Sequence, residues 1–112
     1  MPYGRDASYV SRTFDLVATV VISEPAVASL DRLIATLSLP PTTRARVRGS
    51  LEPLASFPLI GSQLSGRWHG FRFILGPWPW MLLVYEYDET KDEVGVVTIQ
   101  DSRSARAATS QP

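Results

Sequence analysis

Arginine and histidine are the residues of this 112-residue chain best suited to chemistry on a charged substrate. Ten of the eleven basic residues are arginines, whose planar guanidinium group can bind a phosphate or a carboxylate through two hydrogen bonds. His69 is the single histidine, and an imidazole can accept or donate a proton. The absence of cysteine excludes thiol catalysis and zinc sites with thiolate ligands, and one histidine excludes a site built from several imidazoles. We therefore expect no metal and no cofactor.

Charges are segregated along the chain, although the net charge is zero. Residues 44–72 hold five arginines and one glutamate, a local charge of +4, whereas residues 86–101 hold six acids and one lysine, a local charge of −5. Such segregation could gather guanidinium groups on one face suited to phosphates. The alternative is an ordinary solvated surface, and the pattern alone does not decide between the two.

A strand and a helix are predicted first, over residues 13–22 and from Ser23 to before Pro40. Alternate strand residues share one apolar face: Phe14, Leu16, Ala18, Val20 and Ile22. Ser23 can cap the helix, and Pro25 is tolerated in its first turn. Helical spacing predicts an apolar stripe toward the core, made of Val27, Leu30, Ile34 and Leu37.

A second helix is predicted to begin at residues 41–43. Its inner side would carry Val47, Leu51 and Leu54. Arg44 and Arg48 lie one turn apart and would share its outer face. Because Pro53 removes a backbone donor, we expect a bend or an early end near residues 50–53.

Three further strands are predicted, over residues 71–75, 80–87 and 94–99. Their short connections favour an antiparallel meander. The middle strand is apolar on both faces and is expected to be central. The predicted fold is α+β with the order β-α-α-β-β-β, a two-helix hairpin packed on a mainly antiparallel four-stranded sheet.

The chain length allows one compact domain, which we place at residues 13–106 between a flexible lead-in (1–12) and a tail (107–112). The apolar stretch at 16–22 is too short for a signal peptide, and none approaches the length of a membrane span. We therefore expect a cytoplasmic protein without membrane contact.

Several short motifs, in this order, resemble the RelE/ParE superfamily of bacterial toxins. A two-helix hairpin after a first strand is followed by Leu64-Ser65-Gly66, Gly70-Phe71-Arg72, Gly76-Pro77-Trp78, and Leu83-Val84-Tyr85 before an acidic turn. The resemblance covers about residues 14–106. It implies the toxin half of a type II toxin–antitoxin pair, associated with plasmid stabilization and growth inhibition and neutralised by a cognate antitoxin.

Two activities occur in this superfamily. RelE-like members cleave mRNA in the ribosomal A site, and ParE-like members poison DNA gyrase. RelE-like relatives typically have a basic residue opening an Arg-x-x-Tyr stretch in the central strand. Here that position is filled by Leu82, and the position after Tyr85, often basic in relatives, is Glu86.

Cleavage of RNA by its 2′-hydroxyl needs a base, an acid and cations for the developing phosphorane charge. The catalytic candidates lie in two groups: Arg67, His69 and Arg72, and Arg103 and Arg106 in the tail after the last strand. A solvated His69 and an Arg72 that pairs with an acid at 86–93 are the structural alternatives.

Binding roles are predicted for three further groups. Arg44 and Arg48 are candidate RNA-binding cations. Tyr85 and Tyr87 could stack on bases, although core packing is the favoured role for both. Trp68, Trp78 and Trp80 surround the same loop and turn and could form a patch that binds the antitoxin, which could also add a helix or strand at the sheet edge.

An alternative function is a non-catalytic protein-interaction module on a degenerate toxin fold. The zero net charge, the single histidine and Glu86 favour it. An unrelated small-molecule enzyme is disfavoured because the chain has no nucleophile–base motif, glycine-rich phosphate loop or metal-ligand spacing.

Overall fold

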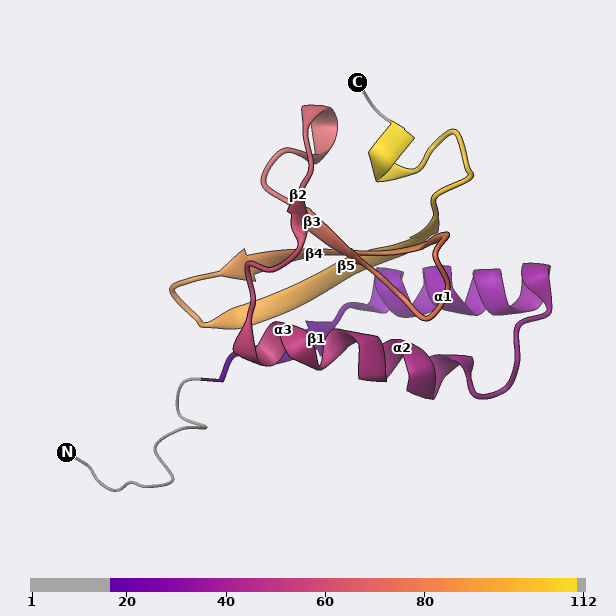
Figure 1. The fold of residues 1–112 in the computed structure, drawn as a ribbon, viewed down its shortest axis with the longest axis horizontal. Helices are drawn as coiled ribbons and strands as arrows, with labels where there is room; N and C mark the ends of the chain where they lie inside the picture. The colour runs from indigo at the N-terminus through magenta and orange to yellow at the C-terminus, as the bar shows by residue number, and fades with distance from the viewer. Residues whose placement is uncertain (1–16, 111–112) are drawn as a thin grey trace.

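A computed structural model describes residues 17–110, which form a five-stranded sheet with helices on one face. The elements are, in order, β1 (Thr19–Ile22), α1 (Glu24–Leu37), α2 (Thr43–Leu51), α3 (Pro53–Ser56), β2 (Ser62–Gln63), the 3-10 turn η2 (Gly66–Trp68), β3 (Arg72–Leu75), β4 (Met81–Asp88), β5 (Glu93–Asp101) and the 3-10 turn η3 (Ala108–Ser110). The predicted α+β class with a helical hairpin after the first strand is confirmed (Figure 1). The lead-in at 1–12 and the first residues of the predicted strand, 13–16, lie outside the described part.

The sheet has the order β1-β5-β4-β3-β2, with β1 parallel to β5 and the other pairs antiparallel. β4 is therefore central, as predicted. The prediction of four strands is wrong, because β2 adds a fifth at the edge of β3. β2 has only two residues, Ser62 and Gln63, and both are polar, so no alternation signals it.

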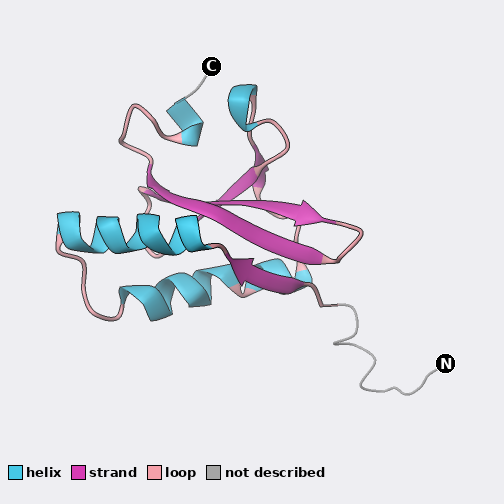
Figure 2. Cartoon of the chain, turned by 180° about the vertical axis from the view of Figure 1, so that it is seen from behind, coloured by secondary structure: helices cyan, strands magenta, loops and turns pink. Residues whose placement is uncertain are grey.

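The helices cover one face of the sheet and bury the larger core against it (Figure 2). This core consists of Ala18, Ala26, Leu30, Val47, Leu51, Leu54, Met81, Leu83, Tyr85, Val94, Val96 and Ile99. α2 ends at Leu51 and α3 begins at Pro53, so the predicted break before Pro53 is confirmed. The buried positions of Val47, Leu51 and Leu54 are also as predicted.

Ser23 caps α1 as predicted, because its hydroxyl accepts a hydrogen bond of 3.2 Å from the backbone N–H of Ala26. The predicted apolar stripe is partly wrong, since Val27 is 45% exposed and Leu37 is 37% exposed. The buried residues of α1 are Ala26, Ser29 and Leu30. Ala26 and Ser29 are small, so the helix approaches β5 closely. The spacing of large apolar residues does not indicate this contact.

A smaller core covers the opposite face of the sheet and consists of Leu64, Leu82, Val84, Ala107 and Ala108. The side chain of Gln100 accepts a hydrogen bond of 2.8 Å from the backbone N–H of Ala108 and holds the chain after β5 against the sheet. Ala107 and Ala108 belong to the segment that the sequence assigned to a tail, and both are buried. Within residues 17–110, no helix combines the length and the apolar character needed to cross a bilayer.

Candidate functional site

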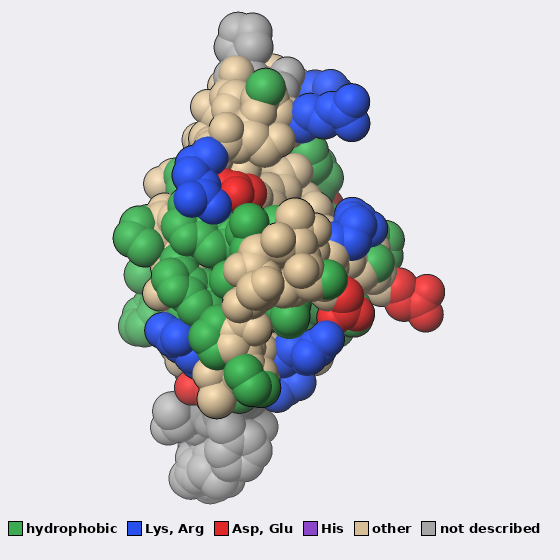
Figure 3. Space-filling model, turned by 90° about the vertical axis from the view of Figure 1, so that its right-hand side faces the viewer, with side chains coloured by type: hydrophobic (Ala, Val, Ile, Leu, Met, Phe, Trp, Pro, Cys, Tyr) green, Lys and Arg blue, Asp and Glu red, His purple; other side chains and the backbone are tan. Residues whose placement is uncertain are grey.

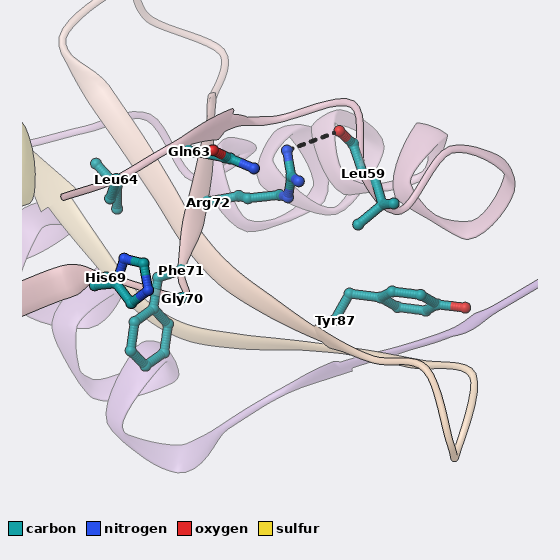
Figure 4. A pocket seen from close by; sticks show the side chains of 8 residues that line it. All are labelled: Leu59, Gln63, Leu64, His69, Gly70, Phe71, Arg72 and Tyr87. Carbon is teal, nitrogen blue, oxygen red and sulfur yellow. Dashed lines mark hydrogen bonds between the residues drawn. The ribbon is translucent and has the colours of Figure 1, made fainter.

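A cleft of about 350 Å³ lies at the β2–β3 edge of the sheet. Its walls are Leu59, Gln63, Leu64, His69, Gly70, Phe71, Arg72 and Tyr87 (Figure 4). Two of the predicted catalytic residues, His69 and Arg72, therefore line one cavity. His69 comes from the segment after η2 and Arg72 from β3, and the Arg72 side chain is directed toward Leu59 and away from His69 (Figure 4).

Arg72 is half-buried and points to the face of the sheet opposite Phe71 and Phe73, as their alternation predicts. Its Nη1 donates to the carbonyl oxygens of Leu59 at 3.1 Å and Gly61 at 2.8 Å. Arg72 makes no ion pair with the described acids at 86–93, so that structural alternative is wrong. One end of its guanidinium group anchors the loop before β2, and among residues 17–110 Nε and Nη2 have no hydrogen-bond partner.

The segment that carries Arg67 and His69 turns sharply between two glycines. Gly66 and Gly70 have φ angles of 62° and 96°, which side-chain-bearing residues rarely adopt. The backbone N–H of His69 donates to the carbonyl of Gly66 at 3.0 Å and closes the turn. Arg67 and His69 are both exposed, so both side chains are accessible to a large polar substrate.

Tyr85 and Tyr87 have different environments, although they share a strand face. Tyr85 is fully buried and accepts a hydrogen bond of 2.9 Å from the backbone N–H of Gly61, so it packs in the core and cannot stack on a base. Burial raises the pKa of its phenol. Tyr87 is half-buried and lines the cleft, and its hydroxyl donates to the Asp92 carboxylate at 2.6 Å, which raises the pKa of Tyr87.

Arg103 does not face the cleft as a free cation. Its Nε and Nη2 donate to the two carboxylate oxygens of Asp101, each at 2.8 Å, and this pairing lowers the pKa of Asp101. Its guanidinium carbon also lies 4.7 Å from the ring centroid of Trp80. Arg106, three residues later, is exposed. Arg103 therefore supports local structure, and Arg106 remains an accessible cation.

The three tryptophans do not form one patch, which corrects the prediction. Trp68 packs edge-on against Phe71, at 5.7 Å between ring centroids, beside the smaller core. Trp78 and Trp80 stack on each other at 5.9 Å beside the larger core. Arg46 lies 4.6 Å from the Trp78 ring. Trp78 and Trp80 thus each have a ring neighbour and a guanidinium neighbour, and they pack within the fold instead of offering bare ring faces.

The expectation that guanidinium groups gather on one face is also wrong. Arg44 and Arg48 lie on α2, on the helical side, and Arg44 forms an ion pair of 2.7 Å with Asp31 of α1. Arg67 and Arg106 belong to segments that pack on the other face of the sheet (Figure 1). Figure 3 likewise shows Lys and Arg side chains at separate margins of an apolar region. The expectation rests on positions in sequence, whereas the central sheet separates these cations in space.

Leu82 occupies the strand position where the superfamily resemblance implies a basic residue. It is 2% exposed and packs in the smaller core with Ala107 and Ala108. Glu86 is exposed on the same strand. A phosphate therefore has no cation to bind at this position. The described residues also contain no group of three or more His, Asp or Glu side chains that could hold a metal ion.

Sequence reasoning missed Gln63 and the loop at 57–60 as parts of the site region. Gln63 lines the cleft from β2. Phe57, Leu59 and Ile60 are 62%, 54% and 62% exposed. The signal was present, because three large apolar residues occur within four positions of a segment with loop-forming Pro58 and Gly61.

Three solved structures with the same fold are one toxin and two toxin–antitoxin complexes. The RelBE2 toxin–antitoxin complex of Mycobacterium tuberculosis matches with a TM-score of 0.58 and 22% identity, covering 76% of this chain and 98% of that chain. The intact RelBE complex of Escherichia coli matches with a TM-score of 0.56 and 17% identity, covering 78% and 99%.

The free E. coli RelE toxin, in a double arginine-to-alanine mutant, matches with a TM-score of 0.55 and 17% identity, covering 78% of this chain and 85% of that chain. No protein-family model and no curated protein matches the sequence. At these identities the likeness establishes architecture, and the resemblance that the motifs indicated is confirmed at that level. The chain has the RelE toxin fold.

Proposed function

We propose that this protein is the toxin of a type II toxin–antitoxin pair and that a cognate antitoxin neutralises it. The observation that carries this proposal is the fold, which the chain shares over three quarters of its length with toxins in two toxin–antitoxin complexes. Fold alone does not fix function, so the local chemistry must be consistent with it. The chain offers an open cleft with a proton-transfer group and a guanidinium group on its walls.

We further propose that the toxin cleaves mRNA on the ribosome at this cleft. In this reaction a ribose 2′-hydroxyl loses its proton to a base and its oxygen attacks the adjacent phosphorus. The bond from phosphorus to the 5′-oxygen breaks, and that oxygen takes a proton. The products are a 2′,3′-cyclic phosphate and a 5′-hydroxyl. The reaction therefore needs no reactant other than the RNA and a transferred proton.

The cleft residues fit three parts of this reaction. His69 is the proton-transfer group, because its exposed imidazole lines the cavity. Arg72 supplies charge to the phosphorane through Nε and Nη2, while Nη1 is held by two carbonyl oxygens. Arg67 lies on the adjoining turn, where it can contact a neighbouring phosphate of the RNA.

Binding without cleavage is the second candidate, as a gyrase inhibitor or as a non-catalytic interaction module. Two observations favour it: Leu82 is buried where a strand cation is expected, and Arg103 is paired with Asp101. Both remove cations that a ribonuclease would use. In this case the fold would present a surface to a protein target.

Purified protein and mRNA-programmed ribosomes separate these candidates. We expect new 5′ ends within the ribosomal A site, at least ~100-fold less cleavage with His69→Gln, and reduced cleavage with Arg67→Gln. Arg32→Gln, an exposed arginine on α1, is the matched control and should cleave normally. Intact mRNA in the presence of the unmodified protein would overturn the nuclease proposal. Loss of gyrase supercoiling in a parallel assay would then assign gyrase as the target.

A further inference from the structure

An apolar loop and an acidic turn meet at one end of the molecule, apart from the proton-transfer wall of the cleft. The chain at 57–60, after α3, and the β4–β5 turn lie at the same end in both Figure 1 and Figure 2. A hollow of about 510 Å³ lies between them and is lined by Phe57, Pro58, Leu59, Ile60, Tyr87 and Glu89. We call this surface the apolar–acidic surface.

The apolar half of this surface is exposed to an unusual degree. Phe57 and Ile60 are each 62% exposed and Leu59 is 54% exposed, although their side chains are among the largest apolar ones. Clusters of exposed apolar residues with a polar rim are typical of protein-binding sites. The loop is also fixed in place, because Arg72 binds the carbonyls of Leu59 and Gly61. A partner would therefore meet a preformed surface.

The other half carries negative charge. Residues 86–93 contain five acids and one lysine, a local charge of −4. Glu86, Glu89 and Glu93 line a second hollow that shares Tyr87 and Glu89 with the first. Asp88 accepts hydrogen bonds from the backbone N–H groups of Thr90 and Lys91, so the turn is held in shape.

We propose that the apolar–acidic surface binds a polypeptide segment that combines apolar and basic side chains. Leu, Ile or Phe side chains of the segment would cover residues 57–60, and Lys or Arg side chains would face the carboxylates of the turn. A nucleic acid does not fit, because its phosphates would meet those carboxylates. If the proposed function holds, the segment belongs to the antitoxin; that identification rests on the proposed function, whereas the chemistry of the surface does not.

The test uses the full chain and two synthetic peptides of equal length, one alternating leucine with lysine and one alternating leucine with glutamate. Binding is followed by fluorescence anisotropy at two salt concentrations. We expect the leucine–lysine peptide to bind at least ~10-fold more tightly than the leucine–glutamate peptide, and to weaken as salt rises. Equal binding of the two peptides would overturn the proposal.

Substitutions locate the binding. Ile60→Glu should weaken binding of the leucine–lysine peptide at least ~10-fold, because it replaces an apolar contact at this loop with a charge. Glu89→Lys should weaken binding of the same peptide several-fold. Leu75→Glu is the matched control, because Leu75 is 50% exposed at the other end of β3, and it should bind as the unmodified chain does. Equal losses from Ile60→Glu and Leu75→Glu would overturn the assignment to this surface.

Two outcomes distinguish this proposal from a surface covered by the chain itself and from the proposed toxin function. If the peptide binds only after residues 1–16 are removed, the chain's own first residues cover the surface and the partner assignment is wrong. The peptide measurement needs neither growth arrest nor RNA cleavage. A protein that binds the peptide at residues 57–60 without arresting growth would therefore support this inference while the proposed function fails.

Discussion

The backbone N–H of Gly61 donates a 2.9 Å hydrogen bond to the phenolic oxygen of Tyr85, which joins the loop after α3 to the central strand of the sheet. Both residues are buried, and Arg72 binds the carbonyl of the same glycine at 2.8 Å. Gly61 is thus held on its N–H and C=O sides by residues of β4 and β3. The loop that this contact holds adjoins both the cleft and the apolar–acidic surface, because Leu59 and Tyr87 line both.

A side chain at position 61 should destabilise this junction. A Cβ atom there would lie 2.6 Å from the Tyr85 hydroxyl oxygen and 2.7 Å from the carbonyl oxygen of Phe73. We expect Gly61→Ala to lower the free energy of unfolding by about 1–3 kcal/mol, measured by urea denaturation. Gly49→Ala is the control, since its Cβ would meet no atom within 4 Å and alanine favours the helix. Equal midpoints for the two variants would contradict the close packing described.

Alkaline pH should destabilise the fold through Tyr85. Burial raises the pKa of its phenol in the folded state, so the folded protein keeps this proton at a pH where the unfolded chain, with a pKa near ~10, has lost it. The stabilisation is therefore complete below about pH 10 and is lost as pH rises above it. Tyr87 contributes with the same sign, because its hydrogen bond to Asp92 raises its pKa.

Denaturation curves between about pH 8 and pH 11 measure this effect. Tyr85→Phe, which cannot ionise, should lose stability at neutral pH because the Gly61 N–H is left unpaired, and should depend less on alkaline pH. If the free energy of unfolding falls equally with rising alkaline pH in the unmodified chain, in Tyr85→Phe and in Tyr87→Phe, neither phenol causes the fall.

We expect Ser29 to contribute more to the stability of the fold than its small side chain suggests. Its hydroxyl donates to the carbonyl of Ala26 at 2.9 Å and accepts from the backbone N–H of Ile99 at 3.0 Å, which links α1 to β5. Ser29→Ala leaves a buried donor unpaired, and we expect a loss of about 1–3 kcal/mol in thermal or urea unfolding. Ser50→Ala on α2, whose hydroxyl bond is exposed, should change stability by less than about 0.5 kcal/mol. A Ser29→Ala protein as stable as Ser50→Ala would refute the role of this bond.

We expect the guanidinium groups of Arg46 and Arg103 to affect the fluorescence of the stacked tryptophans. Each guanidinium lies over one ring of the Trp78–Trp80 pair. Arg103→Lys keeps the charge but loses the planar group, so we expect a shifted tryptophan emission and stronger acrylamide quenching, with RNA cleavage retained. Arg32→Lys should leave the emission unchanged. Lost cleavage with unchanged emission would instead place Arg103 in the reaction.

The sequence predicted those elements whose signals are local. β4 was recognised because both of its faces are apolar, and the end of α2 because Pro53 cannot continue a helix. β2 was missed because two polar residues carry no periodicity. The buried face of α1 differs from the predicted apolar stripe because Ser29 faces β5. Its hydroxyl accepts a hydrogen bond from the backbone N–H of Ile99, a residue 70 positions later in the sequence.

The site was predicted less well, because it depends on contacts between distant segments. His69 and Arg72 are close in sequence, and they do line one cleft. Arg44 and Arg106 looked equally suitable by type, but the sheet separates them. The sequence makes Tyr85 a candidate for base stacking, but its side chain is buried and bonded to Gly61. Residue type indicated what chemistry was available, and topology decided which groups could act together.

Controlled expression of this chain tests its proposed role as a toxin most directly. Viable counts are followed after induction of the chain alone, and after induction together with each open reading frame adjacent to its gene. We expect growth arrest in the first case and rescue by one of the adjacent reading frames in the second. Unimpaired growth at a protein level confirmed by immunoblot would contradict the assignment as a toxin.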